Sequence, residues 1–159
     1  MKFSISNIDL FNNIFDICKQ YSENIKIYIS ARGLHIQTSD DANIAIIDIK
    51  LNTSYFDTFV CEEEATIDFC LKDICKILKI CKKSKSVTHF ILNDNILKII
   101  VLVDNIKKTF KVNSIYTNYD LIDINTININ NSFTIDSKIL KSVFDDFILF
   151  LERVFKKSN

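Results

Sequence analysis

The sequence is poor in the residues that usually form tight turns, with one glycine and no proline in 159 residues. Hairpins must therefore turn on asparagine, aspartate and serine, of which the first two readily adopt left-handed backbone conformations. Long apolar runs are also lacking, and the start, MKFSISNIDLF, has no signal-peptide core. We therefore expect a soluble, intracellular protein.

The chain has no net charge, because twenty basic residues balance twenty acidic ones. Nucleic-acid-binding domains often carry an excess of positive charge, so any basic surface here must come from local segregation of charge. The apolar fraction of 48% is ample for a core. The length suggests one domain, with at most an appendage.

Metal-ligand spacing is absent: the five cysteines form no CxxC pair, and the only histidines are His35 and His89. We therefore predict no metal and no cofactor. Cys18, Cys75 and Cys81 fall on apolar faces of predicted helices, where a reduced cysteine acts as a small hydrophobic residue. A reducing compartment fits this use of cysteine.

Two acidic runs raise the question of catalysis. Asp40-Asp41 suggests a metal pair and Glu62-Glu63-Glu64 an acidic site, but adjacent acids more often belong to solvated loops. The sequence shows no nucleophile–base pair, glycine-rich phosphate loop or metal-ligand cluster. We therefore expect that the protein is not an enzyme.

The clearest periodic pattern is LKDICKILKICKK, residues 71–83, which predicts one amphipathic helix. Its polar face carries Lys72, Lys76, Lys79 and Lys83. Taken alone, such a face is most simply a solvated helix surface. The alternative is a surface that binds phosphate groups.

This helix belongs to a pattern that occurs twice. The first half has a strand at 2–6, a helix at about 8–22 and strands at 24–30, 34–38 and 43–51. The second half has a strand at 65–69, the helix at 71–83 and strands at 86–92, 95–103 and 107–115. Two β-α-β-β-β units predict an α+β fold in which antiparallel sheets, each with one free face, carry two helices on one side.

Two helices on the same side present a shared polar surface. The first is predicted to place Leu10 and Tyr21 on its apolar face, and Lys19 with Asn12, Asn13 and Gln20 on its polar face. Lysine and amide side chains suit a phosphate backbone, because such contacts are driven by charge and indifferent to base sequence.

Four segments in order, GLHIQTSD (33–40), NIAIIDIKL (43–51), FDTF (56–59) and the helix through KILK (76–79), resemble the first domain of the proliferating cell nuclear antigen family. Its members are the ring-shaped sliding clamps of DNA replication in eukaryotes, archaea and some large viruses. The resemblance covers residues 1–115 and implies the DNA-clamp fold.

The resemblance also implies DNA-binding residues, because the family's helices line a hole that encloses duplex DNA. The implied set is Lys19, Lys76 and Lys79, by matching position, and Lys72 and Lys83, by helical phase. Asn12 and Asn13 stand where many members carry lysines, which implies weaker or differently distributed contact with DNA.

In the family, partners dock beneath a linker that crosses the outer face of the domain. The docking residues implied here are Ser39, Asp40, Asn43, Ile44 and Ile46 of one loop and Ile122, Ile124 and Ile127 of the linker. An ordinary edge strand at 122–129 is an equally open alternative.

The implied organisation is a clamp-like domain at 1–115, a linker at 116–131, and the start of a second domain at 132–159. That start resembles a strand at 133–137 and then a helix, whose Asp145 argues against DNA contact. A chain with one full domain implies six copies, a larger partner, or no ring.

Two functions follow from the resemblance. The first is a processivity factor or clamp subunit that holds duplex DNA and tethers a polymerase or other partners as a homo- or hetero-oligomer. The alternative is a degenerate clamp that acts as a protein-interaction module without DNA. The expected location is the nucleus, or a cytoplasmic replication site if the protein is viral, with a role in replication or repair.

Overall fold

The structure is a computed structural model that describes residues 1–40, 42, 45–84, 86–117, 121–124 and 133–156. The chain divides into two compact units, Met1–Leu121 and Ile122–Asn159. Among the described residues, no helix is long and apolar enough to cross a membrane.

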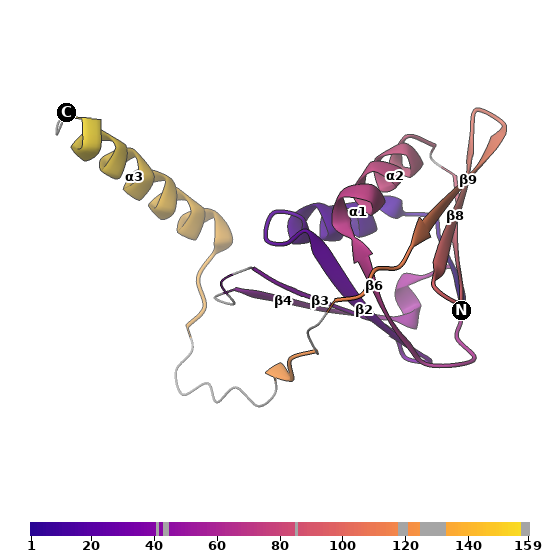
Figure 1. The fold of residues 1–159 in the computed structure, drawn as a ribbon. Coiled ribbons are helices and arrows are strands. Elements are labelled where there is room, and N and C mark those ends of the chain that lie inside the picture. Colours follow the sequence, from indigo (N-terminus) through magenta and orange to yellow (C-terminus); the bar gives the residue numbers. More distant parts are fainter. Residues whose placement is uncertain (41, 43–44, 85, 118–120, 125–132, 157–159) are drawn as a thin grey trace. The chain divides into compact units, whose positions relative to one another are not determined.

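The first unit confirms the predicted double pattern, with one short strand added between the halves (Figure 1). Its first half comprises β1 (Lys2–Ile5), α1 (Ile8–Cys18), β2 (Asn24–Ser30), β3 (Gly33–Ser39) and β4 (Ile46–Asn52). A 3₁₀ turn, η1 (Thr53–Tyr55), and β5 (Thr58–Val60) follow. The second half comprises β6 (Ala65–Cys70), α2 (Leu71–Ser84), β7 (Thr88–Asn93), β8 (Ile96–Val103) and β9 (Ile106–Asn113).

The two halves exchange their first strands. One sheet has the order β5-β1-β7-β8-β9 and the other the order β4-β3-β2-β6, with antiparallel pairing throughout. Thus β1 of the first half pairs with β7 of the second, and β6 of the second pairs with β2 of the first. Each sheet therefore needs strands from both halves, and the halves form one domain.

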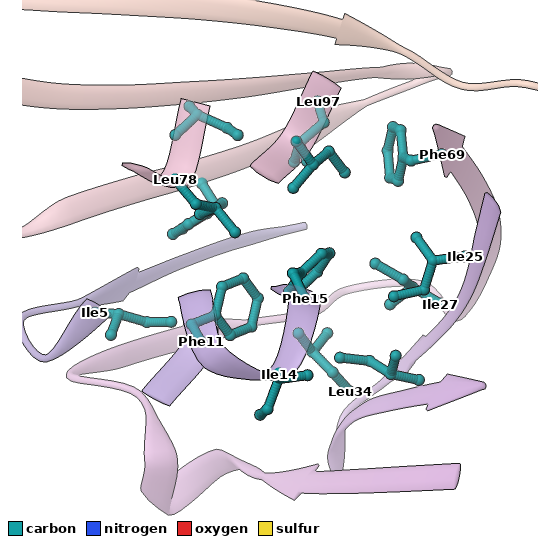
Figure 2. Packing of buried hydrophobic residues seen from close by; sticks show 14 of the residues in the cluster. Ile5, Phe11, Ile14, Phe15, Ile25, Ile27, Leu34, Phe69, Leu78 and Leu97 are labelled. Carbon is teal, nitrogen blue, oxygen red and sulfur yellow. The ribbon is translucent and has the colours of Figure 1, made fainter. Parts of the chain in front are cut away.

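A single core lies between the two sheets and the helix pair (Figure 2). Alternation along β2 turns Ile25, Ile27 and Ile29 into this core. Phe3 stacks on Phe90 with ring centroids 4.5 Å apart. Full burial of an isoleucine, leucine or phenylalanine side chain contributes about 1.5–3 kcal/mol to the free energy of unfolding. Burial of this core is therefore the main source of stability.

The helical cysteines belong to the same core. Cys18, Cys75 and Cys81 are buried, and all are free thiols. Burial raises the pKa of the Cys18 thiol to about 11, with a smaller contribution from Cys75. These thiols act as small apolar side chains, as the sequence predicted.

The turns show how the chain forms hairpins with so little glycine. Asp94, Asp104 and Asn105 adopt positive φ angles of 50°, 50° and 61° in the β7–β8 and β8–β9 turns. Gly33 has φ of +131°, and a Cβ there would lie 2.0 Å from the Leu51 carbonyl oxygen. The one glycine therefore lies where a side chain has no room.

Helix α1 differs from its prediction. It ends at Cys18 rather than near residue 22, and Lys19–Tyr21 continue as a turn closed by Gln20 N–H donating to the Ile17 carbonyl. Leu10 and Tyr21, predicted for the apolar face, are exposed. The buried stripe of α1 is narrower than predicted, because neither Leu10 nor Tyr21 belongs to it. The apolar residues through which α1 packs against α2 and the sheets are Ile8, Phe11, Ile14, Phe15 and Cys18.

The second unit contains α3 (Ser137–Lys156). Residues 133–136 form no strand, although the sequence predicted one, and Phe133 is exposed. A strand needs a neighbour to satisfy its backbone groups, and these four residues pair with none of the described strands. Instead, Asp136 caps the N-terminus of α3, because its Oδ1 accepts hydrogen bonds from the amides of Lys138 and Ile139 at 2.8 and 3.3 Å.

Candidate functional site

The helix pair forms the first candidate surface. Asp16 of α1 lies beside Lys79 of α2, and Asp9 lies beside Lys82, so the helices run antiparallel. Where the two helices meet in the interior, the buried Cys75 thiol donates a hydrogen bond to the Phe15 carbonyl at 3.5 Å. Figure 1 shows α1 and α2 side by side, which leaves their polar sides adjacent.

All five lysines predicted to contact DNA are exposed. They are Lys19, at the end of α1, and Lys72, Lys76, Lys79 and Lys83 of α2. Lys82 also belongs to this surface and was missed by the sequence analysis. Its place three residues after Lys79 was the available signal. We call these six lysines, together with Asp9, Asp16 and Asp73, the helical face.

Asn12 is not part of the helical face, contrary to the prediction. It is 4% exposed, and its Nδ2 donates to Asp16 Oδ2 at 3.1 Å. Its position four residues after Ile8 and three before Phe15 places it on the buried stripe. Asn13 and Gln20 are exposed, as expected.

Three aspartates balance half of the charge on the helical face. Asp16 Oδ1 lies 3.4 Å from Lys79 Nζ, and Asp9 Oδ1 lies 3.1 Å from Lys82 Nζ. Within α2, Asp73 Oδ1 lies 3.7 Å from Lys76 Nζ. The six lysines and three aspartates leave the helical face positive, in a chain with no net charge.

The second candidate surface is the predicted docking loop between β3 and β4. Ser39 pairs with Ile46 at the end of the ladder, and both are half-buried. Asp40 closes the loop, because its Oδ1 accepts the Ala45 amide at 2.8 Å while its own amide donates to the Ala45 carbonyl. Asn43 and Ile44 lie outside the described residues.

The linker residues predicted for docking belong to the second unit. Ile122 is exposed and Ile124 is half-buried, whereas Ile127 lies outside the described residues. Residues 121–124 form no strand, so the edge-strand alternative has no support in the part of 122–129 that the structure describes.

The four-stranded sheet bears a polar row where the sequence analysis expected a free face. Asp68, Lys26, Gln37 and Asp48 are successive cross-strand neighbours over β6, β2, β3 and β4. Lys26 Nζ lies 3.2 Å from Asp68 Oδ2, and Gln37 Nε2 donates to Asp48 Oδ2 at 3.0 Å. Lys26, Gln37 and Asp68 are buried, so part of this face is covered.

The polar row also holds the chain that leaves β9. The Thr117 amide donates to Asp68 Oδ2 at 3.0 Å, and the Thr117 hydroxyl donates to the same oxygen. The Ile115 amide donates to the Asp68 carbonyl at 2.9 Å. Asp68 therefore fixes where the predicted linker begins.

The acidic runs form no metal site among the described residues, where no group of three or more potential ligands converges. Glu62 and Glu63 are exposed, and Glu64 accepts a hydrogen bond from the Tyr28 hydroxyl. That bond raises the pKa of Tyr28. His35 Nε2 contacts Asp48 Oδ2 at 2.9 Å rather than a second histidine or cysteine.

Comparison with known proteins gives a consistent result. The profile of the family described as "Proliferating cell nuclear antigen, N-terminal domain" matches residues 1–131. The chain is 24% identical over 153 residues to a DNA polymerase sliding clamp of Methanothermobacter thermautotrophicus, covering 96% of this chain and 62% of that protein. It is 28% identical over 149 residues to DNA polymerase sliding clamp 3 of Sulfurisphaera tokodaii, covering 93% and 58%.

Solved structures share the fold. A PCNA2–PCNA3 complex from Sulfolobus tokodaii matches with a TM-score of 0.72 at 23% identity, covering 82% of this chain and 52% of that one. PCNA from Thermococcus kodakaraensis matches with a TM-score of 0.71 at 20% identity, covering 79% and 51%. The chain thus has the DNA-clamp fold and spans about three fifths of the length of the curated relatives it matches.

Proposed function

Because the chain belongs to the proliferating cell nuclear antigen N-terminal domain family, we propose that it acts as a sliding-clamp-like processivity factor or clamp subunit. In this role it holds duplex DNA without sequence preference and tethers a polymerase or other partners. The observation that carries the proposal is the antiparallel helix pair, whose adjacent polar sides form one positive face.

The contacts with DNA are made to phosphates. The lysines proposed for these contacts are exposed and supply ammonium groups from the helices or their ends: Lys19, Lys72, Lys76, Lys79 and Lys83. Neither helix exposes an aromatic side chain, since Phe11 and Phe15 are buried. Base stacking is therefore not part of the proposal.

Partner docking is proposed for two separate segments, the β3–β4 loop and the linker. The loop contributes Ser39, Asp40, Asn43, Ile44 and Ile46, and the linker contributes Ile122, Ile124 and Ile127. The hydrogen bonds between Asp40 and Ala45 and the anchoring of Thr117 on Asp68 support this, because a docking surface needs a fixed starting point. The division into a domain at 1–115, a linker at 116–131 and a further segment at 132–159 is part of the same proposal.

Enclosing DNA requires contacts between chains or domains. The longest strands at the sheet edges are β9 and β4, with eight and seven residues. Edge strands present unpaired backbone groups to a partner strand. We assign assembly, with copies of this chain or with related subunits, to these edges.

The test is a charge reversal on the helical face, Lys76→Glu with Lys79→Glu. The matched control is Lys2→Glu with Arg32→Glu, which reverses two exposed basic residues, one on β1 and one in the turn between β2 and β3. Loss of phosphate contacts should weaken binding to a labelled duplex at least tenfold at about 0.1 M salt and flatten the salt dependence. The control should change binding by less than about twofold. Unchanged binding in the helix variant would remove the helical face from the function.

The second candidate is a clamp-fold module that binds proteins but not DNA. The three aspartates on the helical face favour it, because they lower its positive charge. This alternative predicts no measurable DNA binding at any salt concentration, with no difference between the wild type and the charge-reversal variant.

A further inference from the structure

The helical face contains carboxylates that can compete with phosphate groups for its lysines. Asp9 and Asp16 both belong to α1, and each pairs with a lysine of α2 that borders α1. The lysines farther round α2, Lys72 and Lys83, have no such pair among the ion pairs of the described residues. The pairing is therefore concentrated where the two helices meet.

Stability does not account for these aspartates. The side chains of both pairs are between 35% and 62% exposed, and ion pairs so open to solvent contribute about 0–1 kcal/mol each. The buried stripe formed by residues such as Phe15, Cys75 and Leu78 already holds the helices together. The larger effect of the two carboxylates is on the electrostatic potential that an approaching phosphate meets.

Asp16 is held in place rather than free to move away. One carboxylate oxygen accepts the amide of the buried Asn12 at 3.1 Å, and the other faces Lys79 at 3.4 Å. Asp9 lies in the first turn of α1, where the helix dipole favours a negative charge. Both carboxylates therefore remain next to their lysines.

We propose that Asp9 and Asp16 compete with DNA phosphates for Lys82 and Lys79, and so lower the affinity of the helical face for duplex DNA. Each binding event exchanges two ion pairs within the protein for contacts with phosphate. The inference rests on the proposed function and adds a specific control of affinity to it. Weak, charge-driven contact is what lets a protein move along DNA.

The test is the double variant Asp9→Asn with Asp16→Asn. Asparagine keeps the size of each side chain and its capacity to accept the Asn12 amide, so only the charge changes. The matched control is Glu62→Gln with Glu63→Gln, which makes the same change in net charge on the exposed loop between β5 and β6. Binding of a labelled duplex is measured by anisotropy across salt concentrations, and folding by urea unfolding.

The proposal predicts that the asparagine variant binds about tenfold more tightly at 0.1 M salt. The slope of log K against log salt should steepen by up to about 1.8, which is about 0.9 for each lysine that its aspartate keeps from phosphate in the wild type. The control should match the wild type within about twofold. Equal binding by the asparagine variant and the wild type, or an equal gain in the control, would overturn the inference.

The same experiment separates this inference from the function beneath it. If the wild type binds DNA and the Lys76→Glu, Lys79→Glu variant does not, while the asparagine variant shows no gain, only the competition is wrong. If the wild type, control and asparagine variants all fail to bind DNA at the lowest salt concentration, both the competition and the DNA-binding function are wrong.

Discussion

Lysine–aspartate pairs occur in two regions of this molecule and serve different purposes. In the polar row of the four-stranded sheet, Lys26 and Asp68 have side chains that are only 10% and 7% exposed. On the helical face, Lys79 and Asp16 are 57% and 35% exposed. The separations of 3.2 and 3.4 Å are similar, so burial, not distance, distinguishes the pairs.

Burial determines what each pair can do. A buried charge has lost its hydration, so the loss of its partner leaves a large free-energy penalty. An exposed charge exchanges its partner for water or a phosphate at little cost. The buried pair therefore holds the sheet and the chain after β9 in place, while the exposed pairs remain available to a ligand.

The largest effect is expected from breaking the buried pair with Asp68→Ala. This change removes the carboxylate beside the buried Lys26 and both side-chain contacts to Thr117. The free energy of unfolding, measured in urea, should fall by about 3–5 kcal/mol. Asp16→Ala is the matched control, because it removes the carboxylate of an exposed pair. Equal losses in the two variants would show that burial is not what separates them.

A smaller effect is expected from Thr117→Val, which keeps the shape of the side chain and removes its hydroxyl. The backbone amide of Thr117 still donates to Asp68. The free energy of unfolding should fall by about 0.5–1.5 kcal/mol. Amide hydrogen exchange at Ile115 and Thr117 should accelerate, whereas exchange in β8 should follow the global change only. Unchanged exchange at both amides would contradict the anchoring role of Asp68.

The smallest effect is expected from the exposed pair. In a double-mutant cycle of Asp16→Ala and Lys79→Ala, the coupling free energy should be below about 1 kcal/mol. It should fall further in 0.5 M salt, because screening acts strongly on exposed charges. A coupling well above 2 kcal/mol that resists salt would make this pair structural and weaken the proposed competition with DNA.

Periodicity in the sequence was enough to predict the repeated β-α-β-β-β units and the lysine face of α2. It was not enough to predict that β1 and β6 exchange sheets, because alternation records which face a residue takes and not which strand lies beside it. The narrower buried stripe of α1 has a similar cause. Its width depends on how α1 packs against α2, and α1 alone does not specify that contact.

The site was harder to predict than the fold. The exposed lysines follow from helical phase, but the pairing of Asp9 and Asp16 with Lys82 and Lys79 depends on the antiparallel contact of two helices far apart in the sequence. The polar row was missed for a related reason. Lys26, Gln37 and Asp68 occupy ordinary outward positions of strands, and only the cross-strand register brings them together.

The most direct test of the clamp function is retention on DNA of different topology. The native mass of the protein is measured alone and with nicked circular DNA across salt concentrations, and the DNA is then linearised. The account predicts an assembly that stays on the circle through moderate salt and is lost once free ends are present. A monomer or dimer that associates with neither form at any salt concentration would contradict the account and leave the protein-interaction module as the function.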